Sequence, residues 1–138
     1  MNSRQVAVCS WSLHPSSPQD LVSKVQECGL NNIQLALNPL AMQPAWERTQ
    51  AILEDAGINI LSGMLEAKGE DYWTLEPIAQ TGGVRPDETW PATWERATQV
   101  ALIASDFGLS LVTFLLAGFA AQHSFRSGFG LDCGQKKK

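Results

Sequence analysis

The chain has 138 residues, 44% of them hydrophobic, with a formal net charge of -4 and a pI near 5.0. This length suits one domain with its own core, and the acidic balance argues against nucleic acid or anionic lipid as a partner, because both attract an excess of Lys and Arg. The one basic run, residues 136–138, is short and indicates a solvated tail.

Signals for export and for membrane insertion are weak in this sequence. Only a few apolar residues follow Arg4, too few for a secretory signal. The most apolar run, Leu109–Ala121, is shorter than the roughly 18 residues of a spanning helix. Cys9, Cys28 and Cys133 are odd in number and contain no C-x-x-C pair, so we expect reduced, buried thiols. These features predict a cytoplasmic protein without a membrane partner.

The first predicted βα unit covers the N-terminal 29 residues. An apolar run at Val6–Cys9 predicts a strand. Ser17 can then cap a helix, Pro18 suits its first position, and Asp20 stands where a capping-box acid accepts the reciprocal bond. Gly29 supplies the left-handed stop. The apolar face of this helix is expected to comprise Leu21, Val22, Val25 and Cys28.

The second unit repeats this order. A strand is expected at Ile33–Leu37, ended by Asn38 and Pro39. A helix from Pro44 or Ala45 to Ala56 follows, with Gly57 as its stop. Its inner face is expected to comprise Trp46, Thr49, Ile52, Leu53 and Ala56.

The third strand follows Gly57 and ends near Leu65, as an apolar run typical of a strand buried on both faces. The connection after it is long enough to be a binding or active-site loop, and a short helix is expected at Tyr72–Ala79. The next helix begins at about Pro91 and ends at Gly108. Its apolar stripe is expected to comprise Trp94, Ala97, Val100, Ala101, Ala104 and Phe107.

The fourth strand is expected at Leu109–Leu115. Beyond Phe119 the sequence has neither helical nor strand periodicity, so we expect a domain over residues 1–119 and an irregular tail over residues 120–138.

One device recurs at Gly29, Gly57 and Gly108. Each glycine ends a helix and is followed by an apolar residue, a small polar residue and a strand. This internal repeat of a βα unit predicts a parallel α/β fold in which right-handed crossovers join successive strands. Loops at the carboxyl ends of the strands would then share one side, where such folds place their chemistry.

Six segments together resemble the sugar phosphate isomerase/epimerase family with the xylose isomerase-like TIM barrel. They are CSWSL (9–13), NNIQLAL (31–37), GINILSGM (57–64), GEDY (69–72), TGGVRPDETW (81–90) and LVTF (111–114). The resemblance implies a (βα)8 barrel of about 250 residues. It also implies a metal-dependent enzyme that moves a proton next to a sugar carbonyl, with a sugar or sugar phosphate as its partner.

The chain departs from this family in its second half. It stops after about the first four βα units, as a truncated or half barrel. The resemblance therefore implies four parallel strands side by side in sequence order, with helices on one face only. The family's metal ligands come mostly from later strands, so a divalent metal is expected for the full-length family and no ligand is identifiable here. Relatives often carry a His before Ala-Gly-Phe, where this chain has Leu116 before Ala117. We therefore expect a truncated or frame-disrupted enzyme that is inactive alone.

Four residues are candidates for substrate binding, each with a structural alternative: Trp11, Gln34, Glu70 and Arg85. Trp11 can stack on a sugar face or fill the core under a loop. Gln34 can bind a ligand hydroxyl or satisfy a polar neighbour. Glu70, with Glu66 and Asp71, lies where a general base can sit, or at a solvated loop edge. Arg85 can clamp a phosphate or hold its own loop through an ion pair. His14 and His123 are expected at the surface.

Three classes of function remain after the sequence is considered. The first is an isomerase or epimerase fragment, and the second is a small flavodoxin-like α/β binding module with an open sheet. The third is a DNA-repair endonuclease of the same barrel superfamily, which the acidic balance disfavours. A half barrel would leave its first and fourth strands as free edges, so self-association through them is expected.

Overall fold

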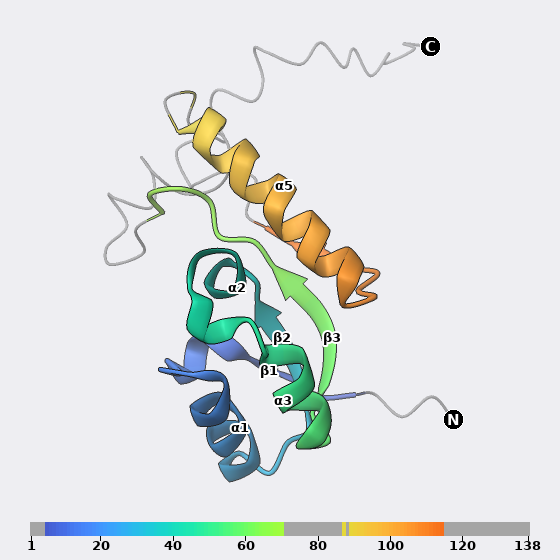
Figure 1. The fold of residues 1–138 in the computed structure, drawn as a ribbon. Helices are drawn as coiled ribbons and strands as arrows, with labels where there is room; N and C mark the ends of the chain where they lie inside the picture. Colours follow the sequence, from blue (N-terminus) through green and yellow to red (C-terminus); the bar gives the residue numbers. More distant parts are fainter. Residues whose placement is uncertain (1–4, 71–86, 88, 115–138) are drawn as a thin grey trace, which may run out of the picture.

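The computed structural model describes residues 5–70, 87 and 89–114. Within these residues, four strands form one parallel sheet in the order β1-β2-β3-β4. The strands are β1 (Val8–Cys9), β2 (Asn32–Ala36), β3 (Asn59–Met64) and β4 (Val112–Thr113). The prediction of parallel βα units laid side by side in sequence order is confirmed (Figure 1).

The helices connect successive strands. They are α1 (Pro18–Glu27), α2 (Asn38–Met42), α3 (Thr49–Asp55) and α5 (Trp90–Asp106), with 3-10 turns η1 (Ser10–Leu13) and η2 (Pro44–Trp46). In space, α1 contacts α3 and α2 contacts α5. The helix expected from Pro44 to Ala56 is two pieces, η2 and α3. The sequence predicts only a strand end at Asn38 and Pro39, whereas α2 begins there. A proline in the first turn suits a helix.

The three glycine stops form the same structure three times. Gly29, Gly57 and Gly108 have φ values of +68°, +71° and +65°. After α3, the N–H of Gly57 donates to the carbonyl of Glu54 at 3.0 Å, and the N–H of Ile58 donates to that of Leu53 at 2.9 Å. Equivalent pairs of bonds follow α1 and α5. Each is a Schellman motif, so the internal repeat predicted from sequence is a repeat of helix endings.

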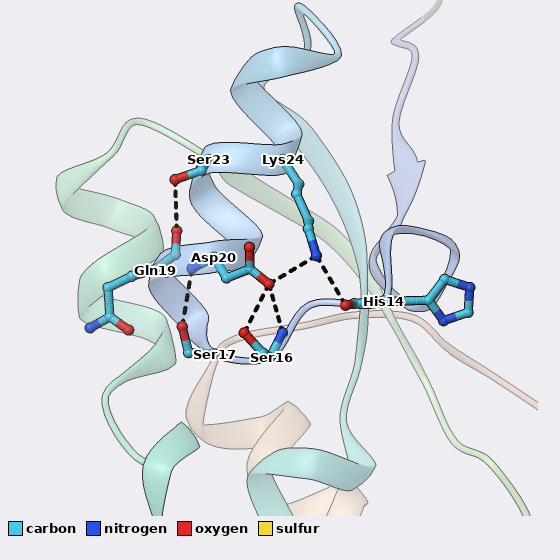
Figure 2. A network of polar contacts seen from close by, with 7 residues as sticks. All are labelled: His14, Ser16, Ser17, Gln19, Asp20, Ser23 and Lys24. Atoms are coloured by element: carbon cyan, nitrogen blue, oxygen red, sulfur yellow. Dashed lines mark hydrogen bonds and ion pairs between the residues drawn. The ribbon is translucent and has the colours of Figure 1, made fainter.

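The start of α1 shows the predicted cap with one change of partner. The Ser17 side chain accepts a hydrogen bond from the Asp20 backbone N–H at 3.1 Å. The Asp20 carboxylate accepts from the N–H of Ser16 at 2.7 Å, one residue earlier than a capping box requires. Figure 2 shows the same carboxylate facing Lys24, whose ammonium lies 2.9 Å from it and also donates to the carbonyl of His14. His14 itself is exposed, as expected.

The two faces of β2 differ in what covers them. Ile33 and Leu35, together with Leu37, are fully buried, while Gln34 and Ala36 between them are half-buried. The buried row belongs to a single core that the helices also enter, comprising Leu21, Val25, Ile33, Leu35, Leu37, Trp46, Leu53, Ile58, Leu65, Val100 and Ala104. The helices therefore cover one face of the sheet, as in a TIM barrel, and the row containing Gln34 is on the inner face.

A bulge in β3 sets the register of this inner face. Ile33 pairs with Ile60, but Gln34 pairs with Ser62, so Leu61 is one extra residue in β3. Asn59 and Leu61 are exposed, Leu61 by 37%. The prediction that this strand is buried on both faces therefore fails at its start, although Ser62, which pairs with Gln34 on the inner face, is only 9% exposed.

The predicted apolar stripe of α5 is confirmed at Ala97, Val100, Ala104 and Phe107, which are in the core or pack against it, and is wrong at Trp94 and Ala101. Trp94 is 61% exposed and Ala101 is exposed, while Thr93 is buried with Val100. Thr93 can be buried because its hydroxyl accepts a hydrogen bond from the Lys68 backbone N–H at 3.2 Å. Trp94 instead lies near Trp90, with ring centroids 5.8 Å apart.

Other expectations have mixed outcomes. On the helix before β3, Trp46, Thr49 and Leu53 are buried as predicted. The two edge strands are shorter than expected, since each has only one neighbouring strand in the described sheet. Cys28 is exposed rather than buried, while Cys9 is half-buried, and both are free thiols. The predicted helix at Tyr72–Ala79, Cys133, His123 and the tail over residues 120–138 lie outside the described residues.

Candidate functional site

The carboxyl ends of β1, β2 and β3 bring polar and aromatic residues to one end of the sheet. Ser10 and Trp11 directly follow β1, while Asn38 follows β2 and Glu66 follows β3 after one intervening residue each. Parallel strands end at the same edge, so these residues share the mouth side of the partial barrel. We call Trp11, Asn38 and Glu66, with the inner-face residue Gln34, the mouth cluster.

Ser10 secures the segment that carries Trp11. It is 2% exposed, and its hydroxyl accepts a hydrogen bond from the Ala36 backbone N–H at 2.8 Å. This bond ties the turn after β1 to the end of β2. Trp11, the next residue, is 36% exposed. Of the two alternatives for Trp11, core filling is therefore wrong, and the residue remains accessible beside a fixed backbone.

Gln34 joins all four strands on the inner face. Its side-chain N–H donates to Oγ1 of Thr113 in β4 at 2.8 Å and lies 3.5 Å from the Gly63 carbonyl in β3. Its carbonyl accepts from the Cys9 thiol in β1, with sulfur and oxygen 3.6 Å apart. Gln34 therefore does satisfy polar neighbours, and it also presents an amide on the half-buried inner face.

Asn38 fixes the backbone of Glu66. Its side-chain N–H donates to the Glu66 carbonyl at 2.8 Å, and its side-chain oxygen accepts from the Glu66 N–H at 3.0 Å. Asn38 is 6% exposed. A buried amide that satisfies both main-chain groups of one residue holds that residue as a strand neighbour would.

Glu66 is the described acid with a perturbed pKa at the mouth. Partial removal from water raises the pKa of its carboxyl, and the nearby negative charge of Glu70 raises it further, while the positive charge of Arg96 on α5 opposes both. The residue nevertheless stays exposed overall, so this shift reflects a local environment rather than deep burial. A carboxyl with a raised pKa, at a strand end, can accept hydroxyl hydrogen bonds or exchange a proton.

Glu70 affects the charge of Glu66 and also closes the turn that follows it. Its carboxylate accepts a hydrogen bond from the Ala67 backbone N–H at 3.2 Å, which closes the turn around Gly69. Glu70 is half-buried and close enough to Glu66 to affect its charge. The structure thus places the candidate Glu70 beside the mouth, but with part of its carboxylate used by the loop.

The candidates chosen from sequence are only partly the residues that the structure brings together. Trp11 and Gln34 are in the mouth cluster, Glu70 is adjacent to it, and Arg85 lies outside the described residues. The sequence does not indicate Asn38 as a site residue, and it indicates Glu66 only as a neighbour of the candidate Glu70. The signal available for Asn38 was an amide side chain placed directly after a buried strand, where parallel strand ends meet.

The described residues do not fit a divalent metal centre by themselves. Among them, no group of three or more His, Cys, Asp and Glu side chains is placed to hold a metal ion. A structural or catalytic metal site normally requires at least three protein ligands. Also within this described part, no helix is both long and apolar enough to cross a membrane.

Comparison with known proteins identifies the fold. No protein-family model matches the chain, and no curated protein matches it. Among solved structures, a xylose isomerase domain protein from Planctomyces limnophilus is similar, with a TM-score of 0.66 and 18% sequence identity. The match covers 90% of this chain and 45% of that chain. The chain therefore has a xylose isomerase-like fold, spanning less than half of the protein it matches.

Proposed function

We propose that this chain is the N-terminal part of a sugar phosphate isomerase/epimerase-like enzyme, and that it does not turn over substrate by itself. The observation that supports this is the fold: four parallel strands in sequence order, in a chain of which 90% matches 45% of a xylose isomerase domain protein. In such an enzyme the reaction would be a metal-dependent proton transfer next to a sugar carbonyl, carried out in the cytoplasm.

The mouth cluster supports binding of a sugar or sugar phosphate. Gln34 offers an amide and Glu66 a carboxylate, both suited to hydroxyl groups, and Trp11 offers an exposed ring that can cover a sugar face. Turnover needs more than this, because an enediolate forming next to a carbonyl must be stabilised electrostatically. The described residues supply no three-ligand metal cage for that purpose, so the ligands would come from other residues.

The flavodoxin-like alternative is disfavoured by the strand order. A doubly wound sheet reverses its order at a switch point and carries helices on both faces. The described sheet runs from β1 to β4 without reversal, and its helix-covered face is one continuous core. A binding module of that class would also lack the barrel-like inner face on which Gln34 lies.

Proton exchange tests the proposal. We expect the 138-residue chain to bind a ketopentose phosphate weakly. We also expect it not to catalyse exchange of the sugar phosphate's C–H proton with deuterated water when manganese, magnesium or zinc is added. Metal-dependent exchange that is lost in Glu70→Gln or Arg85→Ala would disprove the inactivity of this chain. Absence of any binding would disprove the assignment of a sugar phosphate as its ligand.

A further inference from the structure

We propose that Glu66 is the side chain with which this chain holds a hydroxyl group of its ligand, and that Asn38 is the positioning residue that keeps Glu66 in place. This inference rests on the proposed function and names, within it, the carboxylate that contacts the sugar. It also replaces Glu70, the acid chosen from sequence, as the principal binding acid at the mouth.

The position of Glu66 is fixed by an extension of the β2–β3 ladder. The last main-chain bond of this ladder runs from the Leu37 N–H to the Met64 carbonyl at 3.0 Å. Past that point the Asn38 side chain takes over, pairing with both main-chain groups of Glu66 at 2.8 and 3.0 Å. Glu66 is therefore held as firmly as a strand residue although β3 ends at Met64.

The alternation of burial shows which way Glu66 faces. Leu65 and Ala67 are 5% and 2% exposed, and Leu65 belongs to the core under the helices. Glu66 lies between them and is exposed. In an extended chain, successive side chains point to opposite faces. Glu66 thus continues the row of Ser62 and Met64, the row paired with Gln34 and Ala36 on the inner face.

The carboxylate of Glu66 is available for a ligand. Within the described residues its oxygens accept no hydrogen bond, whereas the Glu70 carboxylate is engaged by the Ala67 N–H. Partial removal from water, and then the negative charge of Glu70, disfavour ionised Glu66 in the absence of a ligand. A sugar hydroxyl that donates to this carboxylate would satisfy it, and such charge-assisted bonds are the strong ones.

Binding to one probe, D-ribulose 5-phosphate, tests the role of Glu66. Affinity would be measured by NMR titration of the full chain. We expect Glu66→Gln to weaken binding by about tenfold or more, because a charged acceptor is replaced by a neutral one. Glu27→Gln is the matched control, since it removes the same charge from an exposed residue at the end of α1. We expect it to leave the affinity unchanged.

A double variant tests whether Asn38 acts through Glu66. Asn38→Ala alone should weaken binding and speed amide exchange at Glu66, whose N–H loses its acceptor. In the Glu66→Gln background, the same change should cause little further loss of affinity, because the carboxylate that Asn38 positions is already gone. A purely structural role for Asn38 would give additive losses, and that result would overturn the positioning part of the inference.

The outcomes separate this inference from the proposed function. If the unmodified chain binds the sugar phosphate and Glu66→Gln binds it equally well, the inference is overturned and the proposed function stands. If the unmodified chain does not bind it at all, the proposed function fails, and the inference fails with it. Circular dichroism of each variant shows whether a loss of affinity comes from loss of the fold.

Discussion

The Gln34 side chain donates a hydrogen bond to Oγ1 of Thr113 across 2.8 Å, joining β2 to β4 over the top of β3. The same amide group reaches toward the Gly63 carbonyl at 3.5 Å, and its oxygen accepts from the Cys9 thiol. One side chain on the inner face therefore contacts every strand of the described sheet. Because residues 34 and 113 are 79 positions apart, this contact forms only when the whole sheet is assembled.

The first prediction concerns this bond. Replacing Gln34 with Leu removes an amide that is already satisfied and leaves the Thr113 hydroxyl without its donor, so we expect a loss of about 1 kcal/mol in the free energy of unfolding. Thr113→Val should cost a similar amount. Urea unfolding of the single and double variants checks this, and fully additive losses would show that the two side chains do not interact.

The second prediction concerns the contact of Gly63 with Leu37. A Cβ at Gly63 would overlap the Leu37 side chain, which is itself fully buried on the helix side. We expect Gly63→Ala to destabilise the fold by about 1–3 kcal/mol through overpacking. In a Leu37→Ala background the same change should cost much less, because the added methyl enters vacated space. Equal costs in both backgrounds, measured by urea unfolding, would contradict this packing arrangement.

The third prediction concerns the start of α1, drawn in Figure 2. Ser17→Ala should lower the free energy of unfolding by about 1 kcal/mol, because the Asp20 N–H loses its cap. Ser23→Ala is the control, since its exposed hydroxyl only donates to the Gln19 carbonyl within the helix. We expect that control to be close to neutral.

Asp20 makes the same helix start sensitive to acid. Its pKa is lowered by the backbone N–H of Ser16 and then by Lys24. A carboxyl with a lowered pKa in the folded state contributes stability above its unfolded pKa, and this is lost as the pH falls through the folded value. The stability difference between the natural chain and Asp20→Asn should therefore shrink in acid. A difference that stays constant down to the lowest pH would contradict this role.

Local signals explain why much of the fold was predictable. The glycine stops at 29, 57 and 108 and the cap at Ser17 depend on backbone conformation within a few residues, so the sequence alone located them correctly. Gln34 was recognisable as a polar residue in an apolar strand. Its partners were not, because they come from the other three strands.

Long-range contacts explain what the sequence did not predict. Thr93, and not Trp94, lies on the buried side of α5, because the Thr93 hydroxyl accepts a hydrogen bond from the backbone N–H of Lys68, 25 residues away. Asn38 becomes a site residue only through the backbone of Glu66, 28 residues further on. Neither partner can be identified from helical or strand periodicity, since periodicity describes a face and not the group opposite it.

The fourth prediction concerns the ionisation of Glu66. A carboxyl whose pKa is raised in the folded state binds its proton more tightly there than in the unfolded chain. The folded state then loses stability as the pH rises from the pKa that Glu66 has in the unfolded chain through the higher pKa that it has in the folded chain. Glu66→Gln should therefore be more stable, relative to the natural chain, at pH 7 than in acid, and Glu27→Gln corrects for the general loss of one negative charge.

Carbon-13 NMR of the glutamate carboxyls tests the causes of this shift directly. Glu70→Gln should lower the pKa of Glu66, because it removes the neighbouring negative charge. Arg96→Gln should raise it, because Arg96 opposes the shift. If both variants leave the titration of Glu66 unchanged, its environment is not governed by these charges.

The last prediction concerns the edges of the sheet. In the described residues β1 and β4 each have one neighbour, and apolar side chains flank them: Val6 is 64% exposed before β1, and Leu111 and Phe114 are 54% and 50% exposed beside β4. Unpaired edges with exposed apolar residues favour pairing with another chain. We therefore expect this chain to self-associate through β1 and β4.

Lysine substitution of Val6 or Leu111 should weaken that association in sedimentation velocity experiments, because a charge opposes burial at the edge. Met42→Lys is the matched control, since Met42 is 58% exposed but belongs to α2 and not to an edge strand. A chain that stays monomeric at every concentration tested, or that dissociates equally with Met42→Lys, would show that these strands are not the associating surface.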